Sequence, residues 1–92
     1  MIDTEIPPAL LQLARFLMKS IKVASTVPEL TLWLAVANDL NPYFEGSKLQ
    51  GVSQTLGIWA GLKISDLQGL ATGGFVADYD VGLLRDYPEL KD

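Results

Sequence analysis

Two long apolar stretches dominate this 92-residue chain, and polar side chains interrupt both of them at intervals that suit a helix. In residues 10–24 the interruptions are Gln12, Arg15, Lys19 and Lys22. In residues 49–64 they are Gln50, Ser53, Gln54, Thr55 and Lys63. Neither stretch approaches the ~18 to 20 uninterrupted apolar residues that a membrane-spanning helix needs. The sequence therefore predicts amphipathic helices and no membrane span.

The chain is nevertheless unusually apolar for its length. Hydrophobic residues make up 49 % of it, and the mean hydropathy is +0.25. A domain of this size buries somewhat over ~60 % of the surface that its unfolded chain exposes, which is enough for one modest core. The surplus apolar surface must be covered by something else. We therefore expect a protein partner or a homo-oligomer.

The first two helices are predicted from apolar spacing and from proline positions. Apolar residues recur at intervals of three and four after Pro8, which predicts a helix over about 8–24. Pro28 starts a second helix, for which Ser25 or Thr26 supplies the cap. The apolar run that follows makes this helix buried on most sides, and Pro42 ends it.

Two further helices are predicted from a repeated string, Ser-x-Leu-Gln-Gly. It begins at Ser47 and again at Ser65, and in both copies a glutamine follows the serine by three residues, as in a capping box. The predicted helices cover about 47–60 and 65–72, and Gly73 with its neighbouring glycine ends the second. Internal duplication is one interpretation of this repeat, although four shared residues in a string of five are few.

The C-terminal part predicts one short helix. Asp80 is placed to cap a helix over 81–87, and the tails 1–7 and 89–92 are expected to fray. The predicted fold is all-α: a compact bundle of four helices plus a short C-terminal helix, forming a single domain over residues 1–92.

Charge and missing residue types argue against several functions. The chain has no His and no Cys, so it lacks the usual general base at neutral pH, the thiolate nucleophile and the commonest transition-metal ligands. Seven basic and eleven acidic residues give a net charge of −4, which disfavours nucleic acid as a ligand. The N-terminus is acidic, unlike an export signal, so we expect a cytoplasmic protein. No catalytic residue, cofactor or metal site is predicted.

One segment resembles a DNA-binding motif. Residues 60–67, Ala-Gly-Leu-Lys-Ile-Ser-Asp-Leu, are similar to the opening of the helix-turn-helix unit in phage-repressor-like domains, where Ala-Gly-Leu forms the turn. The resemblance implies a DNA-binding regulator whose recognition helix covers 76–85. That segment carries Asp78 and Asp80, which repel phosphates. The same two aspartates begin a calcium-loop pattern, but leucines follow where further ligands are needed.

Small residues and aromatics supply the candidates for an interaction surface. Small residues recur at every fourth position, at Ser53, Gly57, Gly61, Ser65, Gly69 and Gly73. This spacing suits a close helix crossing, either within the chain or between two copies. Tryptophan and tyrosine are typical interface anchors, although core packing is their commoner role. The candidate interface residues are Trp33, Tyr43, Phe44, Ser53, Gly57, Trp59 and Gly61.

These observations favour a non-enzymatic protein–protein interaction or oligomerisation domain, which self-associates or docks on a larger assembly. One alternative is the helix-turn-helix-like DNA-binding regulator, which requires the cations to gather on one face. The other is a helical binder of an apolar small molecule, which requires a cavity lined by Trp33, Trp59 and leucines.

Overall fold

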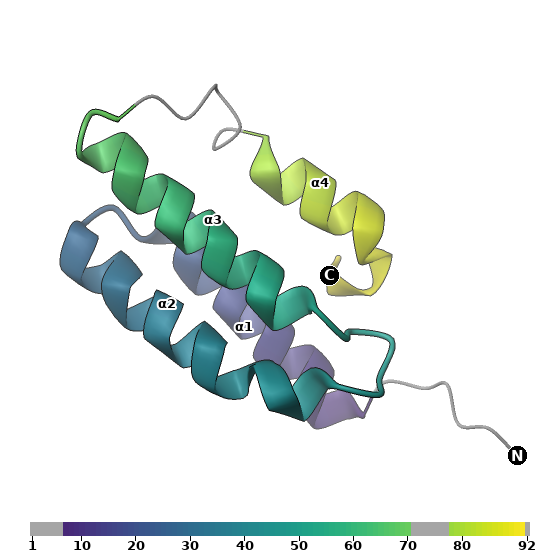
Figure 1. Ribbon diagram of the computed structural model, residues 1–92. Coiled ribbons are helices and arrows are strands. Elements are labelled where there is room, and N and C mark those ends of the chain that lie inside the picture. Colours follow the sequence, from purple (N-terminus) through teal and green to yellow (C-terminus); the bar gives the residue numbers. More distant parts are fainter. Residues whose placement is uncertain (1–6, 71–77, 92) are drawn as a thin grey trace, which may run out of the picture.

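The computed structural model describes residues 7–70 and 78–91, and within these ranges every regular element is helical. The all-α prediction is therefore confirmed. The elements are the α-helices α1 (Pro8–Val23), α2 (Val27–Leu40), α3 (Val52–Leu67) and α4 (Tyr79–Asp86), and the 3-10 helices η1 (Asn41–Phe44) and η2 (Pro88–Leu90). Helices α1, α2 and α3 pack together, and α3 lies between α2 and α4 (Figure 1).

The first two helices form as the sequence predicts. Pro8 opens α1, where the missing N–H of proline costs no hydrogen bond. Thr26 caps α2: its Oγ1 accepts from the Glu29 N–H at 3.3 Å and donates to the Glu29 carboxylate at 2.8 Å. The cap is therefore Thr26, one of the two residues proposed for it.

The prediction of separate helices over 47–60 and 65–72 is wrong, because α3 is one continuous helix over Val52–Leu67. The first Ser-x-Leu-Gln-Gly copy closes a turn before it. Ser47 Oγ accepts from the Leu49 N–H at 3.1 Å, and Gln50 Oε1 accepts from the Gly46 N–H at 3.1 Å. Gly51 then adopts a φ of +85°, which keeps that turn out of the helix.

The second copy of the string ends α3 instead of starting a helix. Gly69 has a φ of +79° and its N–H bonds to the Asp66 carbonyl at 3.0 Å, while the Leu70 N–H bonds to the Ser65 carbonyl at 2.9 Å. These two bonds form a Schellman motif, a common C-terminal stop. The two copies thus lie at opposite ends of one helix. The predicted stop at Gly73 lies outside the described residues.

The C-terminal segment is better ordered than expected. Helix α4 begins two residues before the predicted start, and Asp80 lies inside its first turn instead of capping it. The expectation that 89–92 frays is wrong for Leu90, which belongs to η2 and is fully buried. The predicted tail at 1–6 and Asp92 lie outside the described residues.

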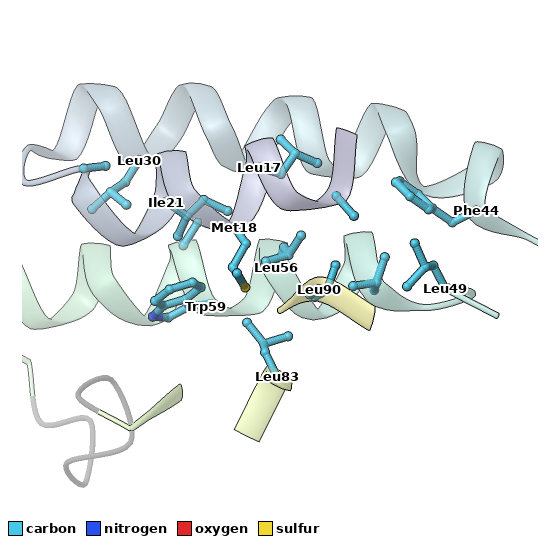
Figure 2. Close-up of a cluster of buried hydrophobic side chains, with 14 residues drawn as sticks. Leu17, Met18, Ile21, Leu30, Phe44, Leu49, Leu56, Trp59, Leu83 and Leu90 are labelled. Atoms are coloured by element: carbon cyan, nitrogen blue, oxygen red, sulfur yellow. The ribbon is translucent and has the colours of Figure 1, made fainter. Parts of the chain in front are cut away.

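The core fills the space between these helices, as Figure 2 shows. Its largest members come from every α-helix, from both 3-10 helices and from the turn before α3: Leu17, Ile21, Leu30, Phe44, Leu49, Leu56, Trp59, Leu83 and Leu90. Helices α2 and α3 make the most extensive contact. At this contact Ser53 Oγ donates to the Ala37 carbonyl, and Gly57 faces Leu34.

We predict opposite effects of leucine at two glycines of α3. A Cβ at Gly57 already lies 3.4 Å from Leu34 Cδ1, so the further atoms of a leucine have no room. Gly57→Leu is expected to lower the free energy of unfolding by about 1–3 kcal/mol. Gly61→Leu is the matched control, because a Cβ there meets nothing within 4 Å and leucine is the better helix former. Urea unfolding followed by circular dichroism measures both, and equal losses would contradict this packing.

Candidate interaction surface

The structure divides the seven candidate interface residues into two groups. Four are buried within the chain, so the prediction that they contact another protein is wrong for them: Phe44, Ser53, Gly57 and Trp59. The small residues among these four serve the contact between α2 and α3, which is the intrachain alternative. The three that reach the surface are Trp33, Tyr43 and Gly61.

A partly exposed aromatic contact joins α1 to α2. Phe16 is 56 % exposed, and its ring meets the ring of Trp33 edge-on, with 5.5 Å between centroids and 79° between planes. Val36 follows Trp33 by one helical turn, and the exposed Leu32 lies one turn before Val36. We name these four residues the Phe16–Trp33 face. Sequence reasoning missed Phe16, because the apolar stripe of α1 is too wide to show which of its edges stays exposed to solvent.

A second, smaller apolar strip lies on α3. Ile58 is 53 % exposed, and Gly61 follows it by three residues, so the two share one side of the helix. Gly61 is only partly buried and has open space beside its Cα. Tyr43 is exposed at the end of η1. Of the predicted surface residues, only Trp33 is thus joined to a further exposed aromatic ring.

Lys63 ties α3 to the end of α1. Its Nζ donates to the carbonyls of Ile21 at 2.7 Å, Lys22 at 2.9 Å and Ala24 at 2.9 Å. These carbonyls lack partners within α1, so the ammonium group caps the negative end of the helix dipole. Burial lowers the pKa of Lys63, and the nearby Glu29 carboxylate opposes that shift.

Trp59 links α3 to α4. Its ring stacks on Tyr79 with 5.8 Å between centroids and 13° between planes, and Lys63 Nζ lies 5.7 Å from the Trp59 ring centroid. The Tyr79 hydroxyl donates to the Thr55 carbonyl at 3.1 Å. Burial raises the pKa of Tyr79, and the charges of Asp86 and Tyr87 raise it further. This cluster holds helices together and presents no reactive group to solvent.

Three of the cations make contacts within the chain. Arg15 donates to the Glu89 carbonyl at 3.0 Å and to the Lys91 carbonyl at 3.2 Å. Lys22 pairs with Asp80 at 3.1 Å, and Lys63 caps α1. Three of the five cations that a DNA-binding surface requires are thus directed at the chain itself.

The helix-turn-helix resemblance is not supported at residues 60–67. This stretch lies entirely inside α3, and no turn separates Ala60 from Leu67. The Ala-Gly-Leu string is helical here because flanking residues on both sides continue the helix. Part of the expected recognition helix, residues 76–77, lies outside the described ranges.

Neither a metal site nor a shared aromatic pocket emerges from the described residues. Within residues 7–70 and 78–91 no group of three acidic side chains is arranged to hold a metal ion, and no helix is long and apolar enough to cross a membrane. Asp80 is engaged by Lys22 and by the Val81 N–H, at 3.1 and 3.0 Å. Trp33 meets the ring of Phe16 and Trp59 that of Tyr79, so the two indoles make different aromatic contacts.

Comparisons with protein-family models, curated proteins and solved structures found no match to this chain. The interpretation of its surface therefore depends on its own residues.

We predict that removal of the Lys63 ammonium destabilises the fold. Lys63→Met keeps most of the aliphatic stem and deletes three charge-assisted hydrogen bonds, two to carbonyls of the last turn of α1 and one to the carbonyl of its C-cap residue Ala24. The free energy of unfolding is expected to fall by about 1–2 kcal/mol, less than the sum of three such bonds because water reaches the site. Lys48→Met is the control, since Lys48 is exposed. Urea unfolding compares the two, and equal values would contradict the capping role.

Alkaline pH is expected to destabilise the protein through Tyr79. The pKa of Tyr79 in the folded protein is raised above 10.0, the ordinary value that it has in the unfolded chain. Between the unfolded and the folded pKa, the unfolded chain therefore releases its phenolic proton first. The stabilising contribution is complete below pH 10 and is lost as the pH rises through the folded pKa. Tyr79→Phe should therefore lose stability less steeply than the native chain above pH 10. Thermal unfolding across this range measures the difference, and parallel slopes would refute it.

Proposed function

We propose that this chain is a non-enzymatic interaction domain that self-associates through the Phe16–Trp33 face. The carrying observation is that Phe16 leaves 56 % of its surface exposed while its ring meets a partly buried tryptophan edge-on. Tryptophan anchors are enriched among residues that dominate binding energy. Burying the exposed part of such a ring contributes on the order of 1 kcal/mol per partner, and each contact of a two-fold dimer occurs twice.

Charge distribution supports a second copy as the occupant of this face. Helix α1 carries Arg15, Lys19 and Lys22 and no carboxylate, whereas α2 carries Glu29 and Asp39 and no cation. Arg15 and Lys22 already contact residues 78–91 of their own chain, so a two-fold contact that places α1 of one copy against α2 of the other brings together helices of opposite net charge without forming new ion pairs with these two side chains. Such complementarity favours the correct partner and register more than it adds affinity.

The chemistry of the chain supports a role in binding instead of catalysis. The sequence contains no His and no Cys. Ser53, the buried serine at the α2–α3 contact, donates its hydroxyl hydrogen to the Ala37 carbonyl and has no general base beside it among the described residues.

The proposal predicts a concentration-dependent mass that depends on Phe16. In light scattering across a dilution series, the native chain should rise from the mass of one 10.0-kDa chain toward that of two. Phe16→Glu should keep the mass of one chain throughout, because a carboxylate on each copy cannot be buried at the contact.

Ile58→Glu is the matched control, since Ile58 is similarly exposed but lies on α3. It should dimerise like the native chain. A native chain that stays monomeric at the highest concentration would reject the proposed self-association. Loss of the dimer in Ile58→Glu but not in Phe16→Glu would assign the contact to α3.

A further inference from the structure

The C-terminal segment, residues 78–91, covers a surface that α1 and α3 build. Leu83 and Leu90 are 2 % and 0 % exposed and belong to the main core. Tyr79 stacks on Trp59 of α3. Tyr79, Leu83 and Tyr87 are spaced by four residues, so one side of α4 supplies anchors in the manner of a peptide helix that docks on a partner.

Polar contacts fix the direction in which this segment lies. Near its start Asp80 pairs with Lys22 of α1 at 3.1 Å. Further along, the Tyr87 hydroxyl donates to the Gln50 carbonyl at 3.2 Å. Near its end Arg15 of α1 donates to the carbonyls of Glu89 and Lys91. The segment is thus contacted near its start, its middle and its end by residues that precede their partners by at least 20 positions.

Helix α4 depends on this docking for its order. It has only eight residues, it contains Gly82, and no side chain caps its N-terminus. An isolated helix of this length is unstable in water, and an internal glycine costs a further ~0.5–1 kcal/mol. The energy that folds the segment therefore comes from the α1–α3 surface.

Charge makes the surface selective for this segment. Residues 78–91 contain four carboxylates, at Asp78, Asp80, Asp86 and Glu89, against two cations. The α1 side chains with polar contacts to the segment are both basic: Arg15 meets backbone carbonyls, and Lys22 meets the Asp80 carboxylate. The α1–α3 surface therefore best accommodates an acidic helix whose tyrosine and leucine side chains serve as anchors.

We propose that two copies of this chain exchange their C-terminal segments, each copy binding residues 78–91 of the other on its α1–α3 surface. The contacts of the segment are the same within one chain and between two chains, so the covalent link through residues 71–77 is what favours the closed monomer. A link of seven residues supplies an effective concentration on the order of millimolar. Exchange therefore becomes populated at comparable protein concentrations, or at lower ones when a chain no longer matches its own segment.

Reversal of the Lys22–Asp80 pair tests this exchange. Lys22→Asp opposes two carboxylates within one chain, and Asp80→Lys opposes two ammonium groups. Mixed together, the two variants can form matched pairs only by exchange: Lys22 of one chain meets Asp80 of the other, and the two introduced charges meet each other. All chains carry Phe16→Glu in addition, so that contact through the Phe16–Trp33 face cannot produce the dimer.

Native mass spectrometry of the mixture should show a one-to-one heterodimer at least tenfold more abundant than either homodimer. The double variant Lys22→Asp/Asp80→Lys is the control, because it restores the pair within each chain and should be as monomeric as the parent. If one of the single variants is unfolded on its own, a gain of helicity when the two variants are mixed supports the exchange equally.

A mixture that shows only the species of its separate components would overturn the proposal. A second measurement needs no change at the docking surface: isotope-labelled and unlabelled Phe16→Glu chains are mixed at millimolar concentration. Dimers of intermediate mass are expected, and single-chain masses alone would contradict exchange whether or not the native chain self-associates through the Phe16–Trp33 face.

Discussion

The close contact between α2 and α3 determines how the rest of the molecule is arranged. Ser53 and Gly57 are small enough for the two backbones to approach, and the Ser53 hydroxyl satisfies its buried hydrogen-bonding potential on the Ala37 carbonyl. Because this hydrogen bond and this glycine contact are directional, they fix the rotation of α3 about its own axis. Trp59 and Lys63, which follow within three turns, are thereby directed away from α2.

Each of these two side chains then secures another helix. Lys63 crosses to the carbonyl end of α1, so the helix that opens the bundle is capped by one that comes about forty residues later. Trp59 supplies the flat surface on which Tyr79 of α4 stacks. A helix as short as α4 gains its stability from such contacts and not from its own backbone. The α2–α3 contact therefore positions the two side chains that hold α1 and α4.

The sequence predicts the helices whose signals are redundant and fails where one local pattern serves two structures. Helices α1 and α2 combine apolar periodicity with a proline start, so their positions follow directly. The Ser-x-x-Gln pattern is ambiguous, because its side chains satisfy free backbone groups in a turn at Ser47 as well as at a helix start. At Ser65 the pattern precedes a left-handed glycine, and the backbone bonds of a helix stop prevail.

The same limit applies to the surface, since spacing shows that a helix has a wide apolar stripe but not which edge another helix covers. Tertiary packing covers Phe44 and Trp59 and leaves Phe16 outside. The remaining exposed apolar groups differ in what they offer a partner. Ile58 stands beside Gly61, so its strip contributes one branched side chain and little further area. Phe16 and Trp33 present two contacting rings whose mutual orientation is already fixed, so little side-chain entropy is lost when a partner covers them. The apolar surplus of this chain is therefore most useful for binding where α1 meets α2.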